Sequence, residues 1–271
     1  MAKISMEDRH QYLNKITSYR EAIKILLKKE ETVLAGLKKS VGNAGFKRLG
    51  LADDMINLAS NYIILSGVSQ SMLKLRNEEA LNDGRKSLYK AVIYLEEVVT
   101  NLIDAPYSDY EDKLAEISSL DTGRRYLLAR KLGLCIQLLE NAYGDNTKWK
   151  WAFVDLEGRY AAGVKNLLDI KNAVTNTDPR SPNYEPSVRH LRLAKRLLMQ
   201  AADRYRERYE LSTNRIDDFK MGIHFLGALR RLHIILGDRE DSENVKKKLD
   251  IWSSKLEIDS KKIAEAEKKN S

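Results

Sequence analysis

The chain has 271 residues, of which 43% are hydrophobic and 32% are charged, and its formal net charge is +8. This composition is too apolar for a disordered chain, and the small numbers of glycine and proline favour long regular elements with short connections. The basic excess is mild for this length, so net charge alone indicates only a weak attraction to polyanions.

The single cysteine, Cys135, excludes a disulfide within the chain and a thiolate metal cluster. Its apolar neighbours predict a buried, structural thiol. No stretch approaches the roughly 20 apolar residues that span a bilayer, and the first residues lack the apolar run of a secretory signal. We therefore expect a cytoplasmic protein without a membrane span.

Apolar residues spaced three and four apart predict an all-α chain of about nine helices and no strand. The predicted helices are 5–39, 46–77, 84–103, 109–118, 123–143, 147–174, 187–210, 214–236 and 242–268. Asn82-Asp83-Gly84 predicts a turn or cap before the third helix, and Thr147 is the predicted start of the sixth.

The first, second and last of these helices carry heptad-like patterns, with Glu30 as the one polar break in the first. The first two helices, joined by a turn at 41–45, predict a long antiparallel hairpin. The whole set favours long antiparallel helical hairpins stacked as a bundle or an irregular solenoid. A coiled-coil seam left uncovered in one chain would seek a second copy, so a homo-oligomer is one hypothesis.

Three of the four prolines, Pro179, Pro182 and Pro186, stand in the segment 176–186. Proline removes a backbone N–H and disfavours helical geometry in the residue before it. This segment is the predicted linker loop between an N-terminal helical region, 1–175, and a C-terminal three-helix region, 187–271, which is expected to pack on the first.

The helix predicted after this linker is strongly amphipathic and basic. Its apolar side gathers Leu191, Ala194, Leu198, Ala201, Tyr205 and Tyr209. Roughly opposite stand the basic residues Arg189, Arg192, Lys195, Arg196 and Arg206. Because a guanidinium group can grip a phosphate or carboxylate in a fork, this face is a candidate anion-binding surface. The alternative is that this face is exposed to solvent and forms ion pairs with acidic residues of neighbouring helices.

A second basic cluster combines Arg124, Arg125 and Tyr126 with Arg130 and Lys131. In the basic helix itself, tyrosines alternate with arginines over 204–209, a pattern that stacking on single-stranded nucleic acid would use. No helix-turn-helix pattern accompanies these residues. Nucleic-acid binding is therefore the alternative function.

The sequence lacks the motifs of common catalytic and metal sites. It has no glycine-rich phosphate loop and no His-Glu-x-x-His motif, and His224 and His233 stand too far apart on one helix for one metal ion. His233 is expected to be a satisfied residue at the edge of the core. The pairs Asp53–Asp54 and Asp217–Asp218 are interpreted as acids at helix starts.

These observations predict a non-enzymatic, cytoplasmic helical adaptor or scaffold. It would bind an acidic or phosphorylated surface of a protein partner, with no cofactor and no metal. The predicted partner-binding residues are Arg189, Arg192, Lys195, Arg196, Arg206, Arg124, Arg125 and Tyr126. The alternative is a nucleic-acid-binding protein that uses the same arginines and lysines.

Overall fold

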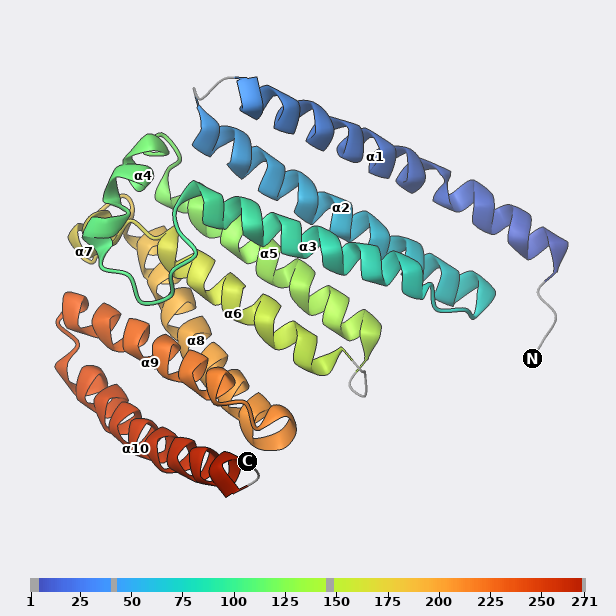
Figure 1. Cartoon of the computed structure of the whole chain (residues 1–271). Helices are drawn as coiled ribbons and strands as arrows, with labels where there is room; N and C mark the ends of the chain where they lie inside the picture. Colours follow the sequence, from blue (N-terminus) through green and yellow to red (C-terminus); the bar gives the residue numbers. More distant parts are fainter. Residues whose placement is uncertain (1–4, 40–42, 145–148, 270–271) are drawn as a thin grey trace. The chain divides into compact units, whose positions relative to one another are not determined.

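The computed structural model describes residues 5–39, 43–144 and 149–269, and these residues form ten α-helices and no strand (Figure 1). The predicted all-α class is confirmed. The helices are α1 (Met6–Lys39), α2 (Ala44–Leu73), α3 (Glu78–Val98), α4 (Glu111–Glu116), α5 (Thr122–Tyr143), α6 (Lys150–Asn166), α7 (Ile170–Thr175), α8 (Tyr184–Arg208), α9 (Ile216–Leu236) and α10 (Arg239–Lys269). A 3-10 turn covers Tyr107–Asp109, and a π-helical turn covers Tyr209–Thr213.

Two of the differences from the predicted helix boundaries have a clear local cause. The predicted helix 147–174 is interrupted, because the Asp169 side chain accepts the backbone N–H of Asn172 at 3.1 Å and starts a separate helix, α7. α3 starts earlier than predicted, since Asn77 caps it through the N–H of Ala80 at 3.0 Å. The predicted turn at 82–84 is wrong, because these residues lie inside α3, where Gly84 packs against Tyr62 of α2.

Two other predicted features fall on residues that the structure does not describe. The turn at 41–45 includes the undescribed residues 41 and 42, and the helix start at Thr147 lies within the undescribed range 145–148.

The chain divides into two compact units, and the division differs from the predicted one. The first unit is Met1–Thr100 with Asp112–Leu156, and the second is Asn101–Glu111 with Glu157–Ser271. The predicted linker therefore lies inside the second unit. Only 176–183 separate α7 from α8, and Pro186 is in the first turn of α8, where a missing N–H costs no helical hydrogen bond.

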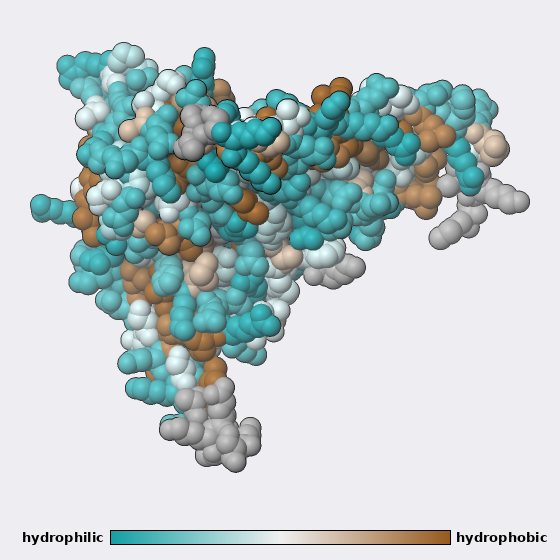
Figure 2. Space-filling model, turned by 45° about the horizontal axis from the view of Figure 1, so that its top comes forward, coloured by the Kyte–Doolittle hydropathy of each residue, from teal (hydrophilic) through white to brown (hydrophobic). Residues whose placement is uncertain are grey.

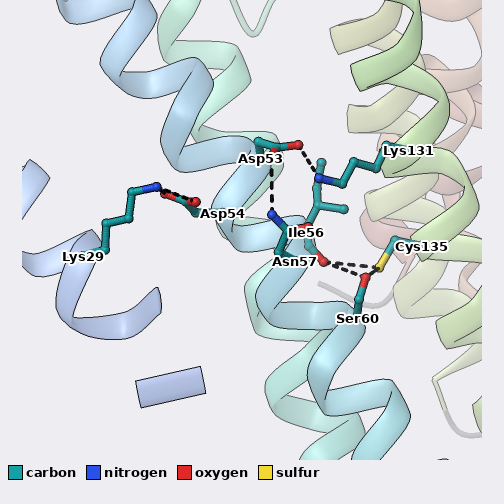
Figure 3. Close-up of polar contacts among 8 residues, drawn as sticks. All are labelled: Lys29, Asp53, Asp54, Ile56, Asn57, Ser60, Lys131 and Cys135. Carbon is teal, nitrogen blue, oxygen red and sulfur yellow. Dashed lines mark hydrogen bonds and ion pairs between the residues drawn. The ribbon is translucent and has the colours of Figure 1, made fainter. Parts of the chain in front are cut away.

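In the first unit, α1 and α2 form the predicted antiparallel hairpin, and α3 and α5 pack on α2 (Figure 1). Asp53 and Asp54 lie well inside α2 rather than at its start, and they point to opposite neighbours (Figure 3). Lys131 of α5 donates to Asp53 at 2.5 Å, and Lys29 of α1 donates to Asp54 at 2.8 Å. The interpretation of these acids as helix-dipole partners is therefore wrong.

Two further polar groups of the first unit are held inside it. Glu30, the break in the first heptad pattern, is buried and accepts hydrogen bonds from Tyr94 at 2.6 Å and Lys90 at 2.8 Å. Cys135 is buried as predicted, with its sulfur 3.4 Å from the Ser60 hydroxyl (Figure 3), and burial raises the pKa of its thiol. Both groups serve packing between helices.

In the second unit, α9 packs between α8 and α10, and aromatic rings fill the contact. Tyr205 stacks on Phe225 with ring centres 5.6 Å apart, and Tyr209 stacks on Phe219 at 5.0 Å. Gly158 of α6 makes room for this cluster, because an added Cβ would lie only 2.6 Å from the Tyr205 ring. This aromatic core fixes how α8 presents its opposite face.

The surface drawn in Figure 2 is mainly hydrophilic, with apolar residues between the polar ones. Among the described residues, no helix combines the length and the apolar character needed to cross a membrane.

Candidate functional site

The predicted basic face of α8 separates into exposed and fixed residues. Arg189, Arg192 and Arg196 are exposed on one side of the helix. Arg189 contacts Glu185 of the preceding turn, whereas Arg192 and Arg196 form no ion pair with any residue in the described ranges. The structure therefore leaves two guanidinium groups, one helical turn apart, available to a ligand.

The remaining two predicted residues of this face are held by acids of the second unit. Lys195 contacts Asp238, just before α10. Arg206 donates to Glu210 at 3.0 Å, and its guanidinium lies 5.2 Å from the Trp252 ring centre. Lys195 and Arg206 therefore form ion pairs with nearby acids, as the alternative interpretation expects, and they are not part of an open anion-binding surface.

A groove of about 500 Å³ lies between α8, α9 and α10 and has one of the exposed arginines, Arg196, in its lining. Its lining residues are Lys195, Arg196, Met199, Leu229, His233, Asp241, Asn244, Val245 and Lys248. Leu229 and Val245 are buried and form an apolar floor, while charged groups stand at the edges. Lys248 is itself occupied, because it donates to Asp203 at 2.7 Å. Of the three cations that line the groove, only Arg196 lacks an acidic partner in the described part of the chain.

One end of the groove carries an ion-pair network that joins α8, α9 and α10. His233 Nδ1 lies 3.2 Å from Asp238 Oδ2 and 3.7 Å from Asp241 Oδ2, and Lys195 contacts the same Asp238 oxygen. The hydrogen bond from Lys195 is the largest cause that lowers the pKa of Asp238. His233 is buried and satisfied, as predicted. The sequence did not reveal this network, because 237–241 fall between two predicted helices.

His233, Asp238 and Asp241 also form a donor set of the kind that holds a divalent cation, with ligand atoms within 4.8 Å of one another. Two features oppose that use. The ammonium group of Lys195 already occupies an Asp238 oxygen, and the positive end of the α10 dipole lies beside the two carboxylates. The cluster therefore fits an ion-pair network better than a metal centre.

The second predicted cluster, in the first unit, is largely structural. Arg125 is only 4% exposed and donates to the carbonyls of Leu120 at 2.8 Å and Ile117 at 3.0 Å. The structure thus gives it a role in closing the turn before α5, in place of the predicted ligand-binding role. Arg124 is exposed and 3.2 Å from Asp121, and half-buried Tyr126 lies under the Arg130 guanidinium, 5.8 Å from it.

The tyrosines that suggested nucleic-acid stacking are in the core. Tyr205 and Tyr209 are buried against Phe225 and Phe219, so their rings have no face to offer to a base. Of the arginines that alternate with them, Arg208 is itself buried and paired with Asp218, and Arg206 is half-buried beside Glu210. The nucleic-acid alternative therefore depends on the arginines alone.

Comparison with known proteins identifies one family. The TP0443 family matches residues 8–260, and the chain belongs to it. No curated protein and no solved structure matches the chain.

Proposed function

We propose that this member of the TP0443 family is a helical adaptor that binds an acidic or phosphorylated segment of a protein partner through α8. The observation that supports this function best is the pair Arg192 and Arg196. Both are exposed, they are four residues apart, and neither has an acidic partner among the described residues. A carboxylate or phosphate placed between them could accept hydrogen bonds from both guanidinium groups.

Arg189 extends the same surface by almost two turns from Arg196. Its pair with Glu185 is an exposed contact between residues four apart, and such pairs contribute only about 0.3–0.5 kcal/mol. A ligand with a higher charge density can therefore displace Glu185 at small cost. Phosphate is the stronger candidate, since it carries nearly two charges and three acceptor oxygens.

The adjoining groove gives the partner segment a second point of contact. Arg196 stands at its edge, and Leu229, Val245 and Met199 supply apolar contacts. A segment with an acidic or phosphorylated residue beside an apolar side chain would use both features. We therefore propose a short linear segment as the ligand, rather than a flat acidic surface.

The remaining parts of the proposal follow the sequence-based expectations. We propose a binding protein rather than an enzyme, acting in the cytoplasm, where the buried thiol of Cys135 stays reduced. We also propose that the chain associates with a second copy of itself through a heptad-patterned helix face.

The test is a matched pair of charge reversals. Arg192→Glu/Arg196→Glu removes the proposed contacts, and Arg180→Glu/Arg215→Glu makes the same change in net charge at two other exposed positions. Binding is measured by fluorescence anisotropy with a labelled phosphoserine peptide that carries a leucine beside the phosphoserine, with its unphosphorylated form, and with single-stranded RNA.

We expect the first variant to lose at least about tenfold in affinity for the phosphopeptide, which corresponds to about 1.4 kcal/mol, and the second to lose less than about threefold. Equal losses in both variants would show a net-charge effect and would refute the proposed site. Tighter binding of RNA than of the peptide, with a steep dependence on salt, would favour the nucleic-acid alternative.

A further inference from the structure

One face of α5, in the first unit, exposes three leucines. Leu127, Leu134 and Leu138 are 60%, 59% and 46% exposed, whereas Leu132 and Leu139 of the same helix are buried. Spacings of seven and four residues put the exposed leucines on one side of the helix, over a length of about 16 Å. Single exposed leucines are ordinary, but a row along one helix marks an interaction surface.

Lys131 completes this row without adding a free charge to it. It stands four residues after Leu127 and three before Leu134, so the four positions follow the 4-3-4 spacing of a helix-packing seam. Its ammonium group donates to Asp53 at 2.5 Å, on the neighbouring helix α2 (Figure 3). The aliphatic stem of Lys131 therefore bridges the leucines while its charge is neutralised.

The border of the row is basic. Arg124 and Arg130 are exposed beside it, and between Thr122 and Leu139 the chain contains no acidic residue. The contact of Arg124 with Asp121 is an exposed pair three residues apart, which contributes little and exchanges easily. At the other end of the row, the exposed Gln137 and Asn141 are uncharged. The surface therefore joins an apolar seam to a positive edge.

We propose that this leucine row is a docking site for an amphipathic helix of a protein partner, with apolar residues at heptad spacing and acidic residues along its flank. The seam spacing lets a second helix lie lengthwise, and the acids of that helix would answer Arg124 and Arg130. A second copy of α5 fits less well, because it brings no carboxylate between Thr122 and Leu139. This surface is separate from α8 and does not depend on the function proposed for α8.

The test uses the full chain and two labelled synthetic peptides of three heptads. Both carry leucine at the a and d positions, and one has glutamate and the other lysine at the flanking e and g positions. Binding is measured by fluorescence anisotropy in the Arg192→Glu/Arg196→Glu background, so that the basic face of α8 does not contribute. We expect the acidic peptide to bind at least tenfold more tightly than the basic one.

Three variants locate that binding. Leu127→Gln/Leu134→Gln/Leu138→Gln should weaken the acidic peptide at least tenfold. Arg124→Glu/Arg130→Glu should do the same and should improve the basic peptide. A matched control, Ile251→Gln/Ile258→Gln on α10, changes two isoleucines of similar exposure and should leave affinity within about twofold.

Unchanged affinity in both α5 variants would overturn the proposal, as would equal losses in the α10 control. Far-ultraviolet circular dichroism checks that each variant folds. If the leucine variant does not fold, the arginine variant still tests the proposal. Light scattering after size exclusion gives a further check. A dimer of the wild-type chain that the leucine substitutions dissociate would assign the row to a second copy and refute the acidic-helix proposal.

Discussion

Lys165 of α6 provides a direct test of how the second unit is held together. Only 4% of its surface is exposed, and its ammonium nitrogen lies 5.3 Å from the centre of the buried Tyr110 ring. No ion pair with a described residue offsets its burial. Burial lowers the pKa of Lys165 from 10.5 to about 8, and Asp104 opposes this shift while Arg231 adds to it. A lysine at this position is therefore costly to keep charged.

The size of the effect follows from the shift. One pKa unit corresponds to about 1.4 kcal/mol, so a fall from 10.5 to about 8 means that the charged side chain costs about 3 kcal/mol in the folded state. Below pH 8 both states hold the proton and the full cost is present. Between pH 8 and 10.5 the unfolded chain binds the proton and the folded chain does not, so this residue makes stability rise with pH.

We therefore expect Lys165→Met to increase the free energy of unfolding at pH 7 by about 1–3 kcal/mol, because the attraction between the ammonium group and the Tyr110 ring, at most about 2 kcal/mol, is lost as well. The advantage of the variant should shrink as the pH approaches 10. Urea denaturation followed by circular dichroism between pH 7 and 10 measures this difference. The variant and the wild type contain the same tyrosines, so the effect of tyrosine titration on stability cancels when the two are compared.

The matched control is Lys171→Met, since Lys171 also faces a tyrosine ring, at 5.6 Å from Tyr107, but is exposed. Its effect should be below about 1 kcal/mol and independent of pH. A loss of stability in Lys165→Met at pH 7, or a gain that is constant from pH 7 to 10, would refute the argument from burial.

Three other substitutions test the structural roles. Arg125→Ala should lower the free energy of unfolding by about 2–4 kcal/mol because two carbonyls lose their donor, while Arg124→Ala should change it by less than 1 kcal/mol; equal effects in urea denaturation would contradict the buried role. Asp218→Ala should cost about 3–5 kcal/mol, since it leaves the buried guanidinium of Arg208 without its carboxylate. A thermal melt that does not shift would show that this pair is not needed. Gly158→Ala should cost about 1–3 kcal/mol because the added methyl group meets an aromatic ring, and a stabilised variant would show that the packing is looser than the structure indicates.

The periodicity of apolar residues predicted most of the helices, because a helix that buries one side must repeat with its own turn. It failed where local signals competed with packing. Asn82-Asp83-Gly84 has the composition of a turn, yet it lies inside α3, where Gly84 is buried against α2. The break before α7 depends on one side chain, Asp169, whose capping bond has no counterpart in the apolar pattern.

The candidate site could be predicted only in part, because a helical pattern shows which residues share a face but not what covers that face. The pattern placed Arg192 and Lys195 on the same side of α8, and only the structure shows that Asp238 occupies the lysine. The same limit explains Arg125, whose acceptors are carbonyls of the turn before its helix. It also applies to Leu127, Leu134 and Leu138, whose heptad-like spacing is that of a packed helix face although all three are exposed.

The ion pairs show that the net charge of the chain does not measure how much positive charge is available to a ligand. In both units, several cations form ion pairs with acids of a neighbouring helix, as Lys29 does with Asp54 and Lys248 with Asp203. Such cations hold helices together and have little charge left for a ligand. Arg192 and Arg196 differ from these cations because they form no ion pair with a described residue, and they stand four residues apart on one side of α8, so that one ligand group can meet both charges. If recognition used general basicity instead, reversal of any two exposed cations would weaken binding equally, and the matched charge reversals separate these two cases.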